Sequence, residues 1–453
     1  MDVRLAYLFP FFCVSACNWL QGPYFYAVYK TKFDPEDVDD GLKKIYIYGY
    51  SMSLFSSIFA GFLTDRLGRK GACICCCLLY TASCISVHSD SMPLLIIGRI
   101  LGGMASTLFH TAFESWLNDS KIDTTIMSEL FYLQTSLGGI VAILSGGIAF
   151  YSTKYFGLYG PFRVAASFSF LGAILISCLW QENYGGELVD NSSNSATKTK
   201  DHENVVIKAI PISKVLFQMV QNRSLLLLAV IQILFEGPMH VFIMLWNPAL
   251  QDAATNDYLN VTSRQVDIAT PPNVSPLLSP GITFSVFMFS LMLGSYTVSL
   301  FTRKFRVTPE SCLITVFCVA TCSLYCASIS SYLSSIVPKN YYFNVVLGYN
   351  DTDIFDTYKT QMYVYFFFIM YEFAVGVYFP SIAICRSRYI PNTIRASITS
   401  IYRVPQNLFV ILLLLYKADL KIYQRLQMSA AALFIGVFLM LYLNKMAGKK
   451  KIE

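Results

Sequence analysis

Long apolar runs constrain this chain more than any other feature. A sliding count finds about 12 runs of roughly 18–25 residues, and each is long enough to cross a hydrocarbon core about 30 Å thick. With 55% hydrophobic and 14% charged residues, the composition lies outside the range of soluble globular proteins. The first run continues through Trp19-Leu-Gln-Gly-Pro-Tyr24 without a small-residue cleavage site, so we expect a retained helix rather than a signal peptide. The sequence predicts an all-α, multi-pass membrane protein.

One polar stretch divides the apolar runs into two sets of six. From Gln181 to Asn222 the chain is polar, most strongly over Asn191–Glu203, which is typical of a flexible linker. We therefore expect a six-helix bundle over residues 1–180, a linker over 181–222, a second six-helix bundle over 223–444 and a tail over 445–453. The expected helices are Val3–Val28, Leu42–Thr64, Ala72–Val87, Leu94–Leu117, Thr125–Phe150, Gly160–Trp180, Arg223–Trp246, Gly281–Phe301, Pro309–Ser330, Lys359–Cys385, Thr393–Tyr416 and Ile422–Leu443.

The basic residues in the connections predict the orientation in the membrane. Because cytoplasmic connections are enriched in Lys and Arg, both termini and the linker are expected to be cytoplasmic. That placement collects on one side the clusters Arg66/Arg69/Lys70, Arg303/Lys304/Arg306, Arg386/Arg388 and Lys449/Lys450/Lys451. The sequons at Asn260, Asn273 and Asn350 would then face outward. We expect the protein in the plasma membrane.

A polar stripe runs along the expected helix Leu94–Leu117. At 100° per residue, Arg99, Gly103, His110 and Glu114 fall within an arc of ~60°. An arginine at the centre of a span costs about 2.5–3.5 kcal/mol on insertion scales, so the stripe should face protein or a water-filled cavity rather than lipid. Two interpretations remain open: an internal salt bridge that only holds the bundle together, or part of a transport path.

Further deep polar groups lie in the second half. Gln232, Glu236 and His240 follow one another at intervals of four and share a helix face, and Glu372 is similarly deep in its own helix. Arg403 lies about ten residues into the next helix. These charges could pair into structural salt bridges. Alternatively, a guanidinium offers forked donors to an oxyanion while a carboxylate or histidine takes up a proton.

The two halves resemble distant copies of one another. Gln21-Gly-Pro-Tyr24 in the first helix corresponds to Glu236-Gly-Pro-Met239 six helices later. Arg99 stands four residues before Gly103, and Glu372 stands four residues before Gly376. Matches in register across six-helix halves favour parallel repeats with a substrate site between them near the midplane.

The segment Gly61-Phe-Leu-Thr-Asp-Arg-Leu-Gly-Arg-Lys70 matches the motif Gly-x-x-x-Asp-Arg-x-Gly-Arg-Lys between the second and third helices of the major facilitator superfamily. The resemblance implies 12 transmembrane helices in two six-helix bundles that work by alternating access. It also implies a gating charge cluster at the cytoplasmic helix ends. Its expected members are Gly61, Asp65, Arg66, Gly68, Arg69, Lys70, Glu114 and Glu129.

A narrower resemblance extends over nearly the whole chain. It rests on Trp19–Tyr26, Gly98–Gly103, Ala112–Trp116, Gln181–Tyr184, Ile231–Glu236, Tyr378–Ser381 and Arg403–Pro405. Together these segments are similar to the eukaryotic molybdate-anion transporter family within that superfamily. The resemblance implies uptake of molybdate, a tetrahedral dianion, and the central linker and the long outward loops are where this chain departs from it.

Candidate site residues follow from the deep polar positions and the two resemblances. We expect substrate binding by Arg99, Arg403, Asn18, Gln21, Tyr24, Gln134 and Asn407. We expect proton coupling or charge pairing by Glu236, His240, Glu372 and His110. One alternative is an organic-solute carrier in which Tyr24, Tyr26, Tyr378 and Tyr402 line a larger pocket. Another is a transporter-like receptor that binds a ligand without turnover.

The remaining patterns set limits on the chemistry. The 13 cysteines fall within expected helices or at their ends, which favours neither a disulfide framework nor a metal site. No hydrolase or kinase signature and no phosphate-binding loop of the Walker type is present. We therefore expect a gradient-driven transporter and not an enzyme, with no cofactor and no nucleic-acid partner. We expect it to act as a monomer surrounded by lipid.

Overall fold

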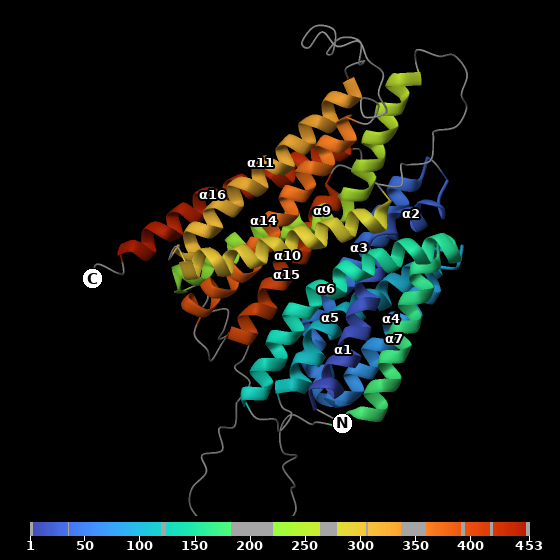
Figure 1. Ribbon diagram of the computed structural model, residues 1–453, viewed down its shortest axis with the longest axis vertical. Coiled ribbons are helices and arrows are strands. Elements are labelled where there is room, and N and C mark those ends of the chain that lie inside the picture. Colours follow the sequence, from blue (N-terminus) through green and yellow to red (C-terminus); the bar gives the residue numbers. More distant parts are fainter. Residues whose placement is uncertain are drawn as a thin grey trace, which may run out of the picture.

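The computed structural model describes residues 3–34, 36–118, 124–182, 221–262, 279–304, 307–336, 359–390, 395–416 and 420–449. Within these ranges the regular structure is helical throughout, and Figure 1 shows the helices gathered into two bundles. Most of the expected linker and the sequons at Asn273 and Asn350 lie outside the described residues. The predicted all-α architecture is confirmed.

The N-terminal half, blue to green in Figure 1, contains one short helix and six long ones. They are α1 (Val3–Gln21), α2 (Phe25–Lys30), α3 (Val38–Leu67), α4 (Arg69–Ser86), α5 (Met92–Asn118), α6 (Thr124–Phe156) and α7 (Gly160–Leu179). The C-terminal half, yellow-green to red, contains α9 (Arg223–Thr262), α10 (Pro280–Lys304), α11 (Pro309–Ile336), α14 (Lys359–Tyr389), α15 (Arg395–Leu415) and α16 (Ile422–Lys449).

Each half has its own buried apolar core. One core is built from residues of α1 to α7, and the other from residues of α9 to α16 with Ala142 of α6 added. Among the described residues, 8 helices are long and apolar enough to cross a membrane. The helices α1, α3, α4 and α15 are of comparable length but are not in that set, and they pack within the same two bundles. The chain is a multi-pass membrane protein.

Two helix boundaries differ most from the sequence expectation. The first helix was expected to run to Val28, but it ends at Gln21 and resumes as α2 at Phe25, because Pro23 cannot donate its backbone hydrogen bond. The seventh expected helix was to end at Trp246, yet α9 continues to Thr262 and has both Pro238 and Pro248 inside it. Asn260, expected in an outward loop, therefore lies in the last turns of α9.

The two halves pack through α6 against α10 and through α3 against α15. We name the two sides of the molecule by the chain: the linker side holds Leu179 and Arg223, which flank the linker, and the loop side holds Thr262 and Pro280. Helices α6 and α10 approach most closely near the loop side. A Cβ atom on Gly146 would lie 2.6 Å from the carbonyl oxygen of Gly281, so only glycine allows this contact.

Hydrogen bonds between described residues join the halves at the loop side. The amide Nδ2 of Asn247 donates to the carbonyl oxygen of Pro23 (3.0 Å), and the hydroxyls of Tyr24 and Ser279 lie 3.1 Å apart. The hydroxyl of Ser285 donates to the carbonyl oxygen of Ile143 (2.8 Å). The break between α1 and α2 thus supplies both a free carbonyl and a phenol to the interface, and the structure is closed at the loop side.

Candidate functional site

Arg99 lies in the loop-side half of α5, where its side chain crosses toward α2 and α3. Its guanidinium carbon is 4.4 Å from the centroid of the Phe25 ring, a cation–π contact. A Cβ atom on Gly49 of α3 would lie 3.5 Å from the Nη2 atom of Arg99, so the guanidinium lies beside α3 at this glycine. The side chain is half-buried between three elements of one half.

The charge of Arg99 has no acidic partner among the described residues. None of the ion pairs there includes it, and its Nε atom is buried without a hydrogen-bond partner. Glu114, on the same stripe, stands fifteen positions along α5, or about 22 Å away along the helix axis, and its side chain is exposed. His110 is exposed as well. The stripe is therefore not an internal salt bridge between Arg99 and Glu114.

Tyrosines from α2 and α3 surround the guanidinium instead. The rings of Tyr29 and Tyr46 pack on Phe25 at 4.5 and 5.0 Å between centroids. Tyr29, Tyr46 and Tyr50 all lie close enough to Arg99 to feel its charge. Aromatic faces and phenol oxygens lower the free-energy cost of removing the guanidinium from water, but they do not neutralise its charge.

Tyr50 also reaches the other half. Its ring meets the ring of His240 edge to face, with 5.8 Å between centroids. The Nδ1 atom of His240 lies 2.7 Å from the carbonyl oxygen of Glu236 and 3.1 Å from the amide of Gln406. Tyr50, which lies within range of the charge of Arg99, therefore also contacts the histidine of the second half.

The carboxylate of Glu236 is held inside the C-terminal bundle. It accepts a hydrogen bond from the hydroxyl of Tyr378 over 3.0 Å, and its residue is buried. Glu372 of α14 is buried too. Among the described residues no ion pair joins Arg99 to either carboxylate. The Gly-Pro pair after Glu236 leaves α9 continuous, unlike the matching pair that ends α1.

The other expected substrate ligands are placed as follows. Gln21 bonds back to the Cys17 carbonyl oxygen (3.1 Å), and Asn18 accepts from the Tyr80 hydroxyl (3.0 Å). Gln134 accepts from the Tyr7 hydroxyl (2.9 Å) near the linker side, and Asn407 is buried in α15. The side chain of Arg403 lies outside what the structure describes. Arg99, Tyr50 and His240 come together across the interface, whereas Gln134 lies away from them.

The expected gating motif joins α3 to α4 at the linker side. Gly61 lies near the end of α3, and the side chains of Asp65 and Arg66 lie outside the described part of the chain. Gly68, at the junction, has a φ of 76°, which favours glycine, and Arg69 is buried. The Nζ atom of Lys70 donates to the carbonyl oxygen of Ser177 over 2.9 Å. Glu129 pairs with Arg4 at 2.7 Å.

Sequence reasoning missed Glu182, which meets the gating motif directly. Its carboxylate accepts from the backbone N–H groups of Lys70 (2.8 Å) and Gly71 (3.2 Å), at the first turn of α4. A carboxylate there satisfies helix donors and complements the helix dipole. The sequence places Glu182 at the start of the linker and within the Gln181–Tyr184 segment of the narrower resemblance, but it indicates no contact with the gating motif, because no spacing rule connects a residue after α7 to the start of α4.

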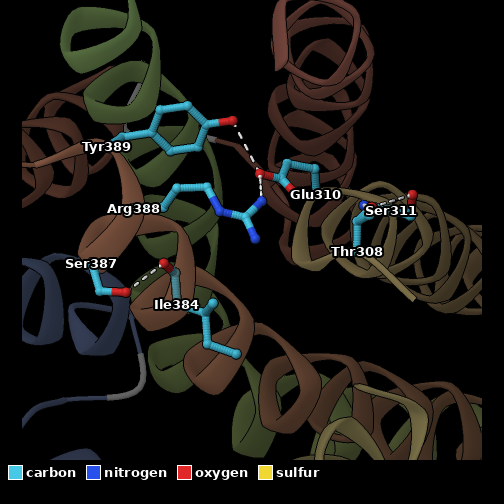
Figure 2. A network of polar contacts seen from close by, with 7 residues as sticks. All are labelled: Thr308, Glu310, Ser311, Ile384, Ser387, Arg388 and Tyr389. Atoms are coloured by element: carbon cyan, nitrogen blue, oxygen red, sulfur yellow. Dashed lines mark hydrogen bonds and ion pairs between the residues drawn. The ribbon is translucent and has the colours of Figure 1, made fainter. Parts of the chain in front are cut away.

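A second missed cluster lies at the linker-side ends of α11 and α14 (Figure 2). The Nη1 atom of Arg388 forms an ion pair with Glu310 at 2.6 Å, and the Tyr389 hydroxyl donates to the same oxygen at 3.0 Å. Glu310 is 1% exposed, so its charge is compensated within the protein. The nearby Thr308 hydroxyl accepts from the Ser311 N–H and caps α11. The sequence shows Glu310 at the start of one expected helix and Arg388 near the end of another, but it does not show that the two side chains pair.

A cavity of about 270 Å³ lies between the halves near the loop side. Tyr26 and Tyr46 line it from the N-terminal half, and Asp252 and Arg425 line it from the C-terminal half. Because Tyr46 also touches Phe25, the cavity lies one aromatic layer from Arg99.

The chain is similar in sequence to a family of membrane transporters and to several curated proteins. A family model described as sugar transporters, 12 TM, matches residues 2–348. The molybdate-anion transporter of Xenopus tropicalis is 28% identical over 433 residues, which cover 93% of this chain and 81% of that protein. That of Xenopus laevis is 28% identical over 417 residues, covering 90% and 78%. That of Danio rerio is 25% identical over 422 residues, covering 88% and 76%.

Solved structures show a similar fold at lower identity. The nucleoside transporter NupG superposes with a TM-score of 0.62 at 14% identity, covering 98% of this chain and 100% of that one. An auto-inhibited POT family peptide transporter superposes with a TM-score of 0.64 at 11% identity, covering 96% of each chain. At such identities the likeness extends to the arrangement of helices.

Proposed function

This chain belongs to the molybdate-anion transporter family of the major facilitator superfamily, and from that premise we propose that it takes up molybdate, or a closely similar tetrahedral oxyanion, by alternating access. It is a membrane transporter, and its curated relatives are transporters rather than enzymes. The proposal includes the two bundles at 1–180 and 223–444, joined by the linker at 181–222, as the bodies that move.

The single observation that carries the proposal is the environment of Arg99. A dianion that leaves water loses hydration that only fixed positive charge and donors can replace. Arg99 offers a guanidinium with no acidic partner among the described residues, close to the interface between the halves. An arginine held only for structure would be expected to meet a carboxylate, as Arg388 meets Glu310.

Proton coupling is assigned to the C-terminal half. Glu236 and Glu372 would repel a dianion if ionised, so uptake is expected to need at least one of them protonated. His240 contacts Tyr50 across the interface and the backbone carbonyl oxygen of Glu236, and it is a second candidate group for taking up a proton near the interface. A proton that enters with the anion reduces the charge carried across the membrane.

The proposed setting is the plasma membrane, with the termini and the linker side in the cytoplasm and the anion entering from the loop side. Lys and Arg concentrate at linker-side helix ends, including Arg69, Lys70, Arg386 and Arg388. Protease accessibility of the 181–222 segment on intact cells tests the orientation. Cleavage of this segment by a protease added outside the cells would show that the linker side faces outward.

Transport by the purified chain in proteoliposomes tests the proposed function. Radioactive molybdate should enter saturably, faster than into empty liposomes, and faster when the outside is more acidic. Sulfate and phosphate serve as competitors that rank the anions. Uptake equal to that of empty liposomes would contradict the proposal, whereas uptake with no pH dependence would remove only the proton coupling.

A second candidate function is transport of an organic solute, which the cavity at the loop side favours. Its volume of about 270 Å³ exceeds the needs of a single tetrahedral oxyanion. Of the four tyrosines suggested for such a pocket, Tyr26 lines this cavity. Tyr24, Tyr378 and Tyr402 are engaged in hydrogen bonds to Ser279, Glu236 and Leu225. Uptake of labelled nucleosides and sugars by the same proteoliposomes decides between the two.

A further inference from the structure

Tyr29 is an unexplained buried group beside Arg99. It lies in α2, the short helix that follows the Pro23 break, and it is 0% exposed. Its hydroxyl is buried and has no hydrogen-bond partner among the described residues. More than about nine in ten buried polar groups in proteins are paired, so an orphan hydroxyl needs a reason.

A second orphan donor stands next to it. The Nε atom of Arg99 is also buried without a partner, and the Tyr29 phenol lies close enough to Arg99 for the two groups to interact. The guanidinium is placed to donate toward the phenol oxygen of Tyr29, yet neither the Tyr29 hydroxyl nor the Nε atom completes a hydrogen bond within the usual distance and angle. A phenol that accepts from the guanidinium also keeps its own O–H group for a ligand. Two unsatisfied donors at one place fit a ligand that brings acceptors.

The groups around this pair include donors but no carboxylate among the described residues. Arg99 is faced by the Phe25 ring, by Gly49 and by the phenols of Tyr46 and Tyr50, with the Cys84 thiol nearby. Guanidinium N–H groups only donate, and phenols both donate and accept. A ligand that has only acceptor atoms can pair with these donors. A ligand with its own O–H group adds a donor, and that donor has no carboxylate nearby in the described part of the chain to accept it.

We infer that the Tyr29 hydroxyl and the Arg99 guanidinium form one subsite that binds a fully deprotonated oxyanion and discriminates against an oxyanion that keeps a proton. The inference rests on the proposed function and adds the residue that sets anion specificity. Molybdate and sulfate have only acceptor oxygens near neutral pH, while phosphate retains an O–H group. A site whose polar groups stay unpaired with the wrong ligand rejects that ligand far more strongly than shape alone would.

The break in the chain explains how a tyrosine reaches this position. Helix α1 ends at Gln21, and the turn through Pro23 redirects α2 so that Phe25, Val28 and Tyr29 are its buried residues. A continuous helix would carry Tyr29 along the axis of α1 instead. The Pro23 break thereby places one oxyanion donor, and the Asn247 contact to its carbonyl holds the break in place.

The test is anion binding by the purified full-length chain, measured by calorimetry with molybdate, sulfate and phosphate at mildly alkaline pH. There sulfate and phosphate are both dianions of similar shape and differ in the O–H group. Tyr29→Phe removes only the hydroxyl. Tyr371→Phe is the matched control, because Tyr371 is also 0% exposed with an unpartnered hydroxyl but belongs to α14.

Tyr29→Phe should weaken molybdate and sulfate binding roughly 10- to 100-fold, the effect of one hydrogen bond to a charged group. It should reduce the preference for sulfate over phosphate and leave the melting temperature unchanged or higher, since no protein hydrogen bond is lost. Tyr371→Phe should bind all three anions as the wild type does.

Molybdate affinity of Tyr29→Phe equal to wild type, an equal loss in Tyr371→Phe, or equal binding of sulfate and phosphate by the wild type would each overturn the assignment. If the wild type binds molybdate and only Tyr29→Phe behaves unexpectedly, the proposed function survives and the Tyr29 subsite fails. If the wild type binds none of the anions, both fail.

Discussion

The side-chain amide of Asn247 in α9 donates a hydrogen bond over 3.0 Å to the carbonyl oxygen of Pro23, the residue that interrupts the first membrane helix. A helix broken at membrane depth leaves carbonyls that must find donors within the protein. Here the donor comes from the other half of the molecule. The same contact therefore stabilises the break and closes the loop side, and both must change when that side opens.

Asn247→Leu is expected to favour opening at the loop side. It leaves the Pro23 carbonyl without its donor, which costs the closed state about 1–3 kcal/mol. Cysteines placed at Tyr24 and Ser279, whose hydroxyls lie 3.1 Å apart, should be joined less often in this background by a bifunctional thiol reagent long enough to span the space of the tyrosine ring. Ser290→Ala, which loses a bond to Ile369 within one half, is the control. Undiminished cross-linking would show that Asn247 does not hold the gate.

Gly146→Val should prevent closure at the loop side and abolish transport. Even its first added carbon would lie 2.6 Å from the Gly281 carbonyl oxygen, and backbone cannot yield as a side chain can. Gly147→Val is the matched control, because a Cβ there meets nothing within 4 Å. Normal uptake by Gly146→Val would mean that α6 and α10 need not approach this closely during the cycle.

Glu182→Ala should lower the maximal rate of transport while leaving the apparent affinity for molybdate nearly unchanged. The change removes acceptors from the first turn of α4 and costs about 0.5–2 kcal/mol, at a place remote from Arg99. We expect Asp65→Asn and Arg69→Ala to behave the same way. Uptake kinetics in proteoliposomes check this, and a large change in affinity with a normal maximal rate would place substrate at the linker side instead.

Arg99→Lys should weaken molybdate binding about tenfold, and Arg99→Ala should weaken it by about 100-fold or more, because lysine keeps the charge but loses the forked donors. We expect Arg403→Lys and Arg403→Ala to follow the same order. Calorimetry on the purified variants measures both series. Arg388→Lys, in the Glu310 pair at the linker side, controls for the general effect of replacing arginine. Normal transport by Arg403→Ala would make that arginine structural.

Uptake should rise as the external pH falls, and Glu236→Gln should flatten this dependence. A neutral amide mimics the protonated carboxylate, so anion binding no longer requires protonation of residue 236. The amide oxygen can still accept the hydrogen bond that the Tyr378 hydroxyl donates to Glu236 over 3.0 Å. Uptake measured across a series of external pH values decides the matter. A pH profile identical to that of the wild type would exclude Glu236 as the coupling group.

The number and approximate position of the membrane helices could be read from the sequence, and so could the superfamily. Hydropathy is a sum over some twenty neighbouring residues, so each span is decided locally. The motif from Gly61 to Lys70 is local too. The break at Pro23 interrupts a helix that the hydropathy predicts to be continuous, although its cause is local as well, because the missing N–H belongs to the residue itself.

What joins these elements was decided by the tertiary structure. Tyr24 and Ser279 meet across 255 positions of chain, and Lys70 meets Glu182 across 112. No periodicity connects residues so far apart. The sequence offered Glu114 and His110 as neighbours of Arg99 because they share its helix face, yet the side chain crosses to Phe25 and Tyr29 of another helix. A helical wheel orders side chains around one axis, whereas their partners depend on the neighbouring helices, and these are positioned only when the whole bundle packs.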